Sequence, residues 1–253
     1  MLFLGSGLRL AAAAAASTAL AVAASAQADA PNMLLTVSAG SFGKSLNVAP
    51  SSVSSSGVGT YYGSLSGTNG SSTIWNCNYN FSAASGADFA TQTGAISITN
   101  TSGADLAFAM TLSLPTAAVE QMTGRFNGSV AAALITGSAS GGIGSMSPSG
   151  SSPLWSASTG GTQIASLFES WNATSRKTPG ASLIGSASFG GPSPSAPADT
   201  FGDSIAVTFR FVLSNNATAS FTTSIGGVGT PVPAPGALAL LASAGLVARR
   251  RRR

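Results

Sequence analysis

Strict alternation of large apolar residues with small or polar ones is the feature that most constrains the fold of this chain. From Ile205 to Leu213, and again from Leu106 to Leu114, every second residue is a large apolar one. From Trp75 to Phe81, aromatic residues and a cysteine alternate with three asparagines. A period of two residues is typical of a half-buried β-strand. These segments predict strands whose apolar face packs in a core and whose other face meets solvent.

Weaker strand patterns recur along residues 27–230. They are Leu34–Ser38, Val58–Leu65, Ala95–Thr99, Val130–Thr136, Leu183–Phe189 and the alternating Phe221, Thr223 and Ile225. Asn215-Asn216 predicts a hairpin turn, and residues 99–104 predict a turn joining two strands. About ten strands with short turns predict an all-β fold, a single antiparallel β-sandwich domain for which a jelly roll is one arrangement.

Three other segments depart from the strand pattern. Ile164, Leu167, Phe168 and Trp171 have the spacing of one helix face, which predicts a helix over Gln163–Trp171. The stretches 137–153 and 190–199 are rich in Gly, Ser or Pro and predict irregular connections.

The N-terminal end predicts a signal peptide over residues 1–26. A short segment with one cation, Arg9, precedes the uncharged apolar run from Leu10 to Ala24. Two sites of the form Ala-x-Ala follow, ending at Ala26 and Ala28. This order is that of a secretory signal helix. A permanent membrane helix is the alternative, and the short run ending in small residues disfavours it.

The C-terminal end, residues 231–253, joins a proline-rich spacer to an apolar run and a basic end. Gly236 to Ala248 is 13 residues long, and the last residues are Arg249, Arg250, Arg251, Arg252 and Arg253. Such a helix is about 20 Å long and barely spans a bilayer core of about 30 Å. Arginines are costly to move through lipid, so we expect them to stay in the cytoplasm. An ordinary C-terminal anchor or a buried amphipathic helix is the alternative.

This tail resembles the PEP-CTERM signal that exosortases process in Gram-negative bacteria. The resemblance covers Val232 to Arg253, with Val232, Pro233, Ala234 and Pro235 as the motif, and it departs from the family at Ala234, where glutamate is expected. It implies Sec-dependent export, transient anchoring in the inner membrane and cleavage by an exosortase. It further implies a structural or adhesive role at the cell surface or in the exopolysaccharide matrix.

The basic charge of the chain comes from its two ends. The chain is +4, but six of its 11 basic residues are Arg9 and the five terminal arginines. The remaining 5 face 7 acidic residues, which leaves residues 27–230 at −2. A body without a basic patch has no electrostatic basis for binding nucleic acid.

The residues needed for most catalysis are missing from the sequence. The chain has no histidine, which excludes Ser-His-Asp triads, Cys-His pairs and most zinc sites. Its single cysteine, Cys77, lies on the apolar face of its predicted strand, so we expect a buried thiol, with a nucleophile or an intermolecular bridge as the alternatives. We therefore predict no catalytic residue, no cofactor and no metal.

The acidic residues are scattered. A glycosidase needs two carboxyl groups at one site. The candidates are Glu120, Glu169, Asp88, Asp105, Asp199 and Asp203, and no spacing marks two of them as a pair. Asp199 and Asp203 have oxygens suited to calcium, but we expect them to cap turns.

Four aromatic residues are candidate glycan contacts: Tyr61, Tyr62, Trp155 and Trp171. Tyr61 and Tyr62 are adjacent, so in a strand they point to opposite faces and one of them can face solvent. Core packing is the interpretation we favour for each. Three functions follow in order of preference: a non-enzymatic structural or adhesive protein, a lectin-like carbohydrate-binding module, and a polysaccharide-active enzyme.

Overall fold

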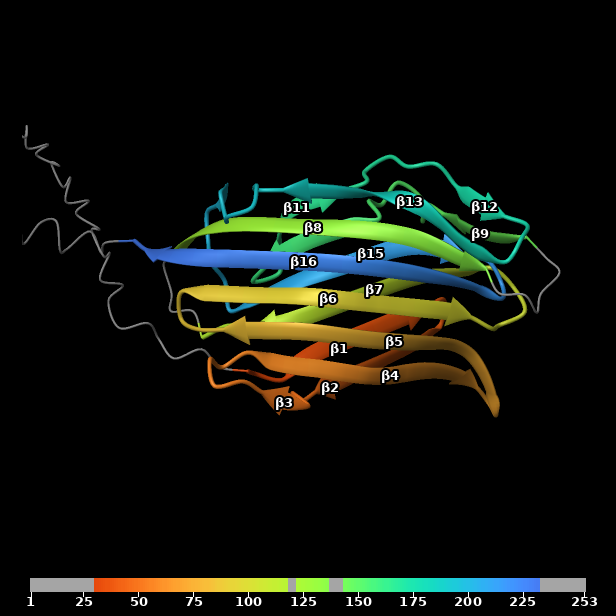
Figure 1. The fold of residues 1–253 in the computed structure, drawn as a ribbon, viewed down its shortest axis with the longest axis horizontal. Helices are drawn as coiled ribbons and strands as arrows, with labels where there is room; N and C mark the ends of the chain where they lie inside the picture. The colour runs from red at the N-terminus through yellow and green to blue at the C-terminus, as the bar shows by residue number, and fades with distance from the viewer. Residues whose placement is uncertain (1–29, 118–121, 137–142, 233–253) are drawn as a thin grey trace, which may run out of the picture.

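Antiparallel β-sheets make up the fold. The computed structural model describes residues 30–117, 122–136 and 143–232, and these residues contain sixteen strands and no helix. Two eight-stranded sheets lie face to face as a β-sandwich (Figure 1). Glu120, the predicted signal peptide and the part of the predicted sorting tail beyond Val232 lie outside the described residues. Within the described ranges, no helix has the length and apolar character needed to cross a bilayer.

The first sheet, here called the front sheet, presents its outer face to the viewer in Figure 1. Its order is β13 (Gly180–Phe189), β8 (Met122–Thr136), β16 (Ala217–Pro231), β6 (Phe89–Asn100), β5 (Ser72–Ser85), β4 (Gly59–Asn69) and β3 (Ser52–Val53), with β14 (Ala196–Ala198) beside β8.

The second, back sheet lies behind it in the same view. Its order is β11 (Thr162–Leu167), β10 (Trp155–Thr159), β15 (Ser204–Leu213), β7 (Leu106–Pro115), β1 (Met33–Ala39) and β2 (Phe42–Val48). Two short strands, β9 (Gly144–Ser147) and β12 (Thr174–Arg176), pair with each other, and β9 also pairs with the end of β15.

The alternating residues face the interior as predicted. Phe209 and Phe211 of β15 meet Phe221 of β16 with ring centroids 4.5 and 5.2 Å apart, which joins the two sheets. Trp75 and Cys77 of β5 are completely buried on the same inner surface. Fully burying one large apolar side chain contributes about 1.5–3 kcal/mol. The period-two pattern therefore identified the core strands and their buried faces correctly.

The hairpin predicted at Asn215-Asn216 is wrong, because the turn there does not join neighbouring strands of one sheet. Asn216 does adopt the left-handed conformation of a turn, with φ 60°. The turn, however, carries the chain from β15 in the back sheet to β16 in the front sheet, so the two strands face each other across the core. The turn at residues 99–104 likewise crosses between sheets, from β6 to β7.

Asn100 ties these two crossings together. Its buried side-chain amide donates to the carbonyl oxygens of Ala104 at 2.7 Å and Leu213 at 2.8 Å. The side-chain oxygen Oδ1 accepts the backbone N–H of Ser102 at 3.0 Å, and the backbone carbonyl oxygen of Asn100 accepts the backbone N–H of Asn216 at 2.7 Å. A buried amide with its groups satisfied holds both turns at one end of the sandwich.

The helix predicted over Gln163–Trp171 is also wrong. Residues 162–167 form the edge strand β11, joined to β10 by Gly160 and Gly161, both at positive φ. Two such residues favour a two-residue hairpin, and here the glycines outweigh the helical spacing. Phe168, at φ 56°, then turns the chain so that Phe168 and Trp171 pack against the core.

Both stretches predicted as irregular contain a short strand. In 137–153 it is β9, and in 190–199 it is β14, which pairs with residues 124–126 of β8. Pro197 lies inside β14, where a residue without an N–H is tolerated because the strand has a single neighbour.

The outer face of the front sheet as candidate site

Of the four aromatic candidates, Tyr62 is the exposed one, with 64% of its surface accessible. Tyr61 is fully buried, and its hydroxyl donates to the Pro31 carbonyl oxygen at 2.6 Å. Trp155 is also buried and donates from Nε1 to Thr223 Oγ1 at 2.9 Å. Trp171 is partly buried against the core. Burial removes Tyr61 and Trp155 as glycan contacts and leaves Tyr62 as the clear surface aromatic.

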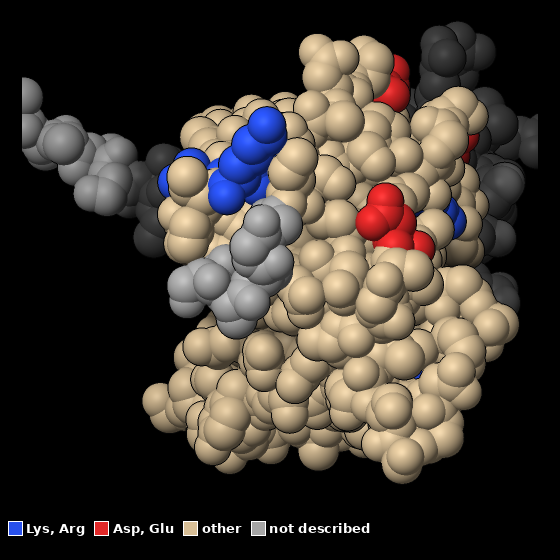
Figure 2. All heavy atoms as spheres, turned by 90° about the vertical axis from the view of Figure 1, so that its right-hand side faces the viewer, with Lys and Arg blue, Asp and Glu red and all other residues tan. Residues whose placement is uncertain are grey.

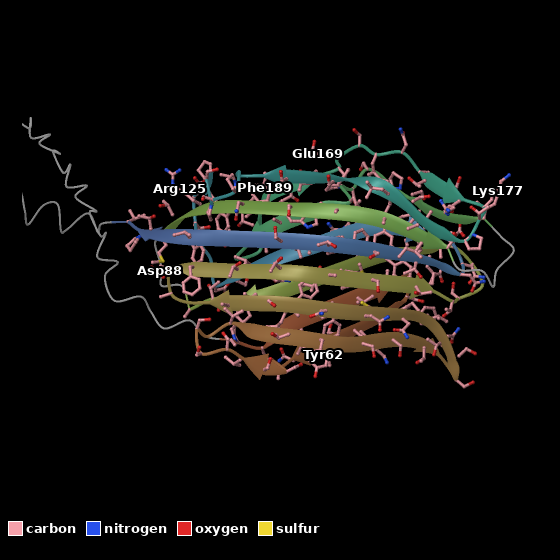
Figure 3. All side chains as sticks on the ribbon, in the orientation of Figure 1. Tyr62, Asp88, Arg125, Glu169, Lys177 and Phe189 are labelled. Atoms are coloured by element: carbon pink, nitrogen blue, oxygen red, sulfur yellow. The ribbon has the colours of Figure 1, made fainter. Side chains whose placement is uncertain are left out.

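The acidic residues form no cluster of three or more in the described part of the chain. No group of three or more Asp, Glu, Cys or His lies close enough there to hold a metal ion. Asp88 and Glu169 lie at different parts of the periphery in Figure 3. Asp203 accepts a hydrogen bond from Ser204 Oγ at 3.1 Å, and Glu169 accepts one from Ser166 Oγ at 2.6 Å. These are local turn contacts on the surface.

Cys77 is a core thiol. It is completely buried on β5 between the sheets. Desolvation by this burial raises the pKa of Cys77 to about 12. Nucleophilic attack needs the thiolate, which this site disfavours at ordinary pH.

The outer face of the front sheet is where exposed polar groups gather. On each strand, the residues that alternate with the core set point outward and are mostly Ser, Thr, Asn or Ala. The strand register aligns them in rows across the sheet. One row takes a residue from each of β4, β5, β6, β16, β8 and β13; we call it the Tyr62 row, and its members are Tyr62, Asn80, Ala95, Thr222, Ala131 and Ser186.

Two shallow hollows open on this row. One, of about 210 Å³, lies at Ala95, with Asn78, Asn80, Ser97 and Ser220 among its lining. The other, of about 330 Å³, lies at Ala131, with Ser129, Ser186, Ser188 and Thr222 among its lining. In each, the methyl of an alanine stands between larger side chains on the two neighbouring strands. Thr222 of β16 separates them.

The polar groups on this face differ in whether they are already paired. Thr99 and Thr218 hydroxyls are 2.7 Å apart, and Ser129 and Ser224 hydroxyls are 2.8 Å apart, so in each pair one hydroxyl donates to the other. The side-chain amides of the β5 asparagines make no hydrogen bond to any described residue. Each such amide has two donors and an acceptor oxygen available to a ligand.

The face is also almost free of charge. Among the strands of the front sheet, the sole charged residue within the described ranges is Arg125. Arg125 and Asp88 both lie at one end of the sandwich, and Lys177 lies at the other end (Figure 3). Figure 2 shows that second end, with a few acidic and basic side chains on an otherwise uncharged surface. The middle of the sheet therefore offers hydrogen bonds and apolar contact, with no ion pairing.

Sequence reasoning found part of this site. It identified the outward asparagines of β5 and noted that one of the adjacent tyrosines can face solvent, but the core packing that it favoured is wrong for Tyr62. It missed Ala95, Thr222 and Ala131, because a row across strands is defined by register. Alternation within a strand predicts on which face a residue lies. It does not predict which residue lies beside it on the next strand.

Comparison with protein-family models gives no match for this chain, and comparison with curated proteins gives none either.

Proposed function

We propose that this chain is an exported, non-enzymatic protein of the cell surface or extracellular matrix of a Gram-negative bacterium, with a structural or adhesive role. The observation that carries the proposal is the C-terminal order of proline spacer, apolar run and five arginines, preceded at the other end by a signal-peptide pattern. In this proposal the Sec machinery exports the chain, and an exosortase removes the tail after transient anchoring in the inner membrane.

The body suits such a role. It is a sandwich with a buried core, and its broad outer face carries hydroxyl, amide and methyl groups with almost no charge. Hydroxyl and amide groups form hydrogen bonds with hydrated polymers at any salt concentration, whereas exposed ion pairs are screened. The absence of histidine from the whole chain supports the non-enzymatic part of the proposal.

Intact-mass measurement on protein from the native host tests the sorting proposal. We expect a chain that begins near Gln27 or Asp29 and lacks the residues after about Pro235. Replacing the five terminal arginines with alanine should reduce membrane retention and leave the tail uncleaved. Full-length chain recovered from the cell surface with Arg253 present would overturn the proposal.

A lectin-like carbohydrate-binding module is the second candidate. The observation that favours it is the exposure of Tyr62 directly opposite Asn80, whose amide is unpaired among the described residues. Aromatic rings stack on the apolar faces of sugars, and amides bind their hydroxyls. Binding without cleavage would support this candidate, and cleavage abolished by Glu120→Gln or Glu169→Gln would support the polysaccharide-active enzyme instead.

A further inference from the structure

The two hollows on the outer face are spaced by the architecture of the sheet. Ala95 is on β6 and Ala131 on β8, and a single strand, β16, runs between them. Neighbouring strands lie about 4.8 Å apart, so the hollows repeat after about 10 Å across the strands. Tyr62 stands two strands from Ala95 in the opposite direction, at the same spacing. Tyr62, Ala95 and Ala131 thus lie at equal intervals along the row. The hollow at Ala95 extends from the row toward Asn78, Ser97 and Ser220, and the hollow at Ala131 extends to the other side, toward Ser129 and Ser188.

Paired hydroxyls border this line on both sides. On one side are Ser129 and Ser224, two residues along β8 and β16 from the Tyr62 row and on the side opposite to Asn78. Thr99 and Thr218 lie on the other side, beyond the row that contains Asn78 and Ser97. The strip between the two hydroxyl pairs holds the free amides of Asn78 and Asn80 and both hollows, and Ser129 of one bordering pair also lines the hollow at Ala131. It runs across the strands, along the Tyr62 row.

The chemistry of the strip selects the class of ligand. Its groups are an aromatic ring, free amides, hydroxyls and methyls, and none of its residues is charged. A polyanion or a cationic peptide would find no counter-charge there. An uncharged polymer with many hydroxyl groups and apolar ring faces matches every group present. A regular spacing of sites further favours a ligand that repeats, such as a sugar chain.

We propose that this strip binds an extended, uncharged polysaccharide laid across the strands, with sugar units seated over Ala95 and Ala131 and another stacked on Tyr62. The inference rests on the adhesive role proposed above and names the polymer class and the binding surface. The hollows are shallow, so each sugar unit contributes little and the length of the chain supplies the affinity. The strip crosses six strands, about 24 Å, and affinity should rise with chain length until the ligand covers it.

The test fills the hollows without removing any group that could bind. Ala95→Val and Ala131→Val add two methyls each on an outward position of a strand, where β-branched residues fit well. The matched control is Ala206→Val, on the outer face of β15 in the back sheet. Binding of soluble neutral glucan oligosaccharides of increasing length is measured by calorimetry, with uronic-acid oligosaccharides of equal length as the charged probe.

We expect each of the two hollow-filling variants to weaken neutral-oligosaccharide binding at least tenfold, and Ala206→Val to leave it unchanged. Tyr62→Ser should weaken binding of the longer oligosaccharides, and Tyr62→Phe should retain it, because stacking does not need the hydroxyl. Preference for the uronic-acid probe would overturn the inference. Equal loss in all three alanine variants would do so as well.

Two further outcomes separate this inference from the proposed function. If no neutral oligosaccharide of any length binds, the inference fails, while the sorting proposal still stands or falls on the intact mass. If sedimentation shows an oligomer that Ala95→Val dissociates, the face is occupied by a second copy of this chain, which also overturns the inference.

Discussion

The inner and outer faces of the same strands are built by opposite rules. On β5 the inner residues, such as Trp75 and Cys77, are fully buried against the other sheet, whereas the outward Asn76 and Asn78 are exposed. An unpaired polar group is costly on the inner face because nothing there replaces water, and Trp75 Nε1 and the side-chain amide of Gln92 are buried there without a hydrogen-bond partner among the described residues. The outer face tolerates exchange among small residues. The inward residues of a strand can thus stabilise the fold while its outward residues bind a ligand, with little interference between the two sets.

The strongest test of this separation compares adjacent residues of β15. Phe209→Asp should destabilise the fold by more than about 4 kcal/mol, because it removes a ring packed against Phe221 and buries an unpaired carboxylate. Thr208→Asp, on the outer face, should cost less than about 1 kcal/mol. Urea unfolding measures both. Equal losses would mean that the two faces are not distinct.

A smaller effect concerns a polar pair within the core. Thr223 Oγ1 accepts from Trp155 Nε1 at 2.9 Å and donates to the Ser129 carbonyl oxygen at 3.0 Å. Thr223→Val keeps the shape and leaves both partners unsatisfied, which should cost about 1–3 kcal/mol. Thr222→Val, one residue away on the outer face, should stay within about 0.5 kcal/mol of the parent. Thermal unfolding of the two variants decides whether the interior is the stricter environment.

Burial also predicts a dependence of stability on pH. The folded thiol of Cys77 stays neutral up to a pKa of about 12, whereas an unfolded thiol ionises near 9.0. The raised pKa leaves stability intact below pH 9. Between pH 9 and 12, ionisation of the thiol in the unfolded chain lowers the free energy of unfolding by about 1.4 kcal/mol per pH unit.

The matched variant Cys77→Ala should remove this part of the alkaline loss. Urea titrations between pH 9 and 10 are the most informative, because burial also raises the pKa of Tyr79 above its ordinary value of 10.0. Rapid alkylation of Cys77 in the native protein at neutral pH would contradict its placement in the core.

These strands also show how far the sequence predicts the molecule. The faces of β5, β7 and β15 follow from alternation, since a buried large residue every second position has one stable orientation. The sheet to which a strand belongs does not follow. The turn at Asn216 would serve either a hairpin or a crossing, and the contact of Phe209 with Phe221 across the core decides it.

The misassigned helix has a different cause. The apolar residues from Ile164 to Trp171 come from a six-residue edge strand and an irregular segment, and their helical spacing is a coincidence of the two. The adjacent glycines Gly160 and Gly161 were the signal that should have decided for a hairpin. For the candidate site, the sequence predicted the outward asparagines, whereas core packing was favoured for Tyr62, which is exposed. To predict the hollows, the register of five strand pairs would have been required.

The smallest expected effect distinguishes paired from free groups within the outer face itself. Thr99 and Thr218 are linked by their hydroxyls, whereas Ser97 and Ser220, opposite each other in the next row, have no side-chain hydrogen bond to a described residue. A double-mutant cycle with Thr99→Val and Thr218→Val should give a coupling of about 0.5 kcal/mol. The same cycle with Ser97→Ala and Ser220→Ala should give none. A coupling above about 1.5 kcal/mol at the threonines would place part of the stability on the outer face, and the division between an inner face for folding and an outer face for binding would then be incomplete.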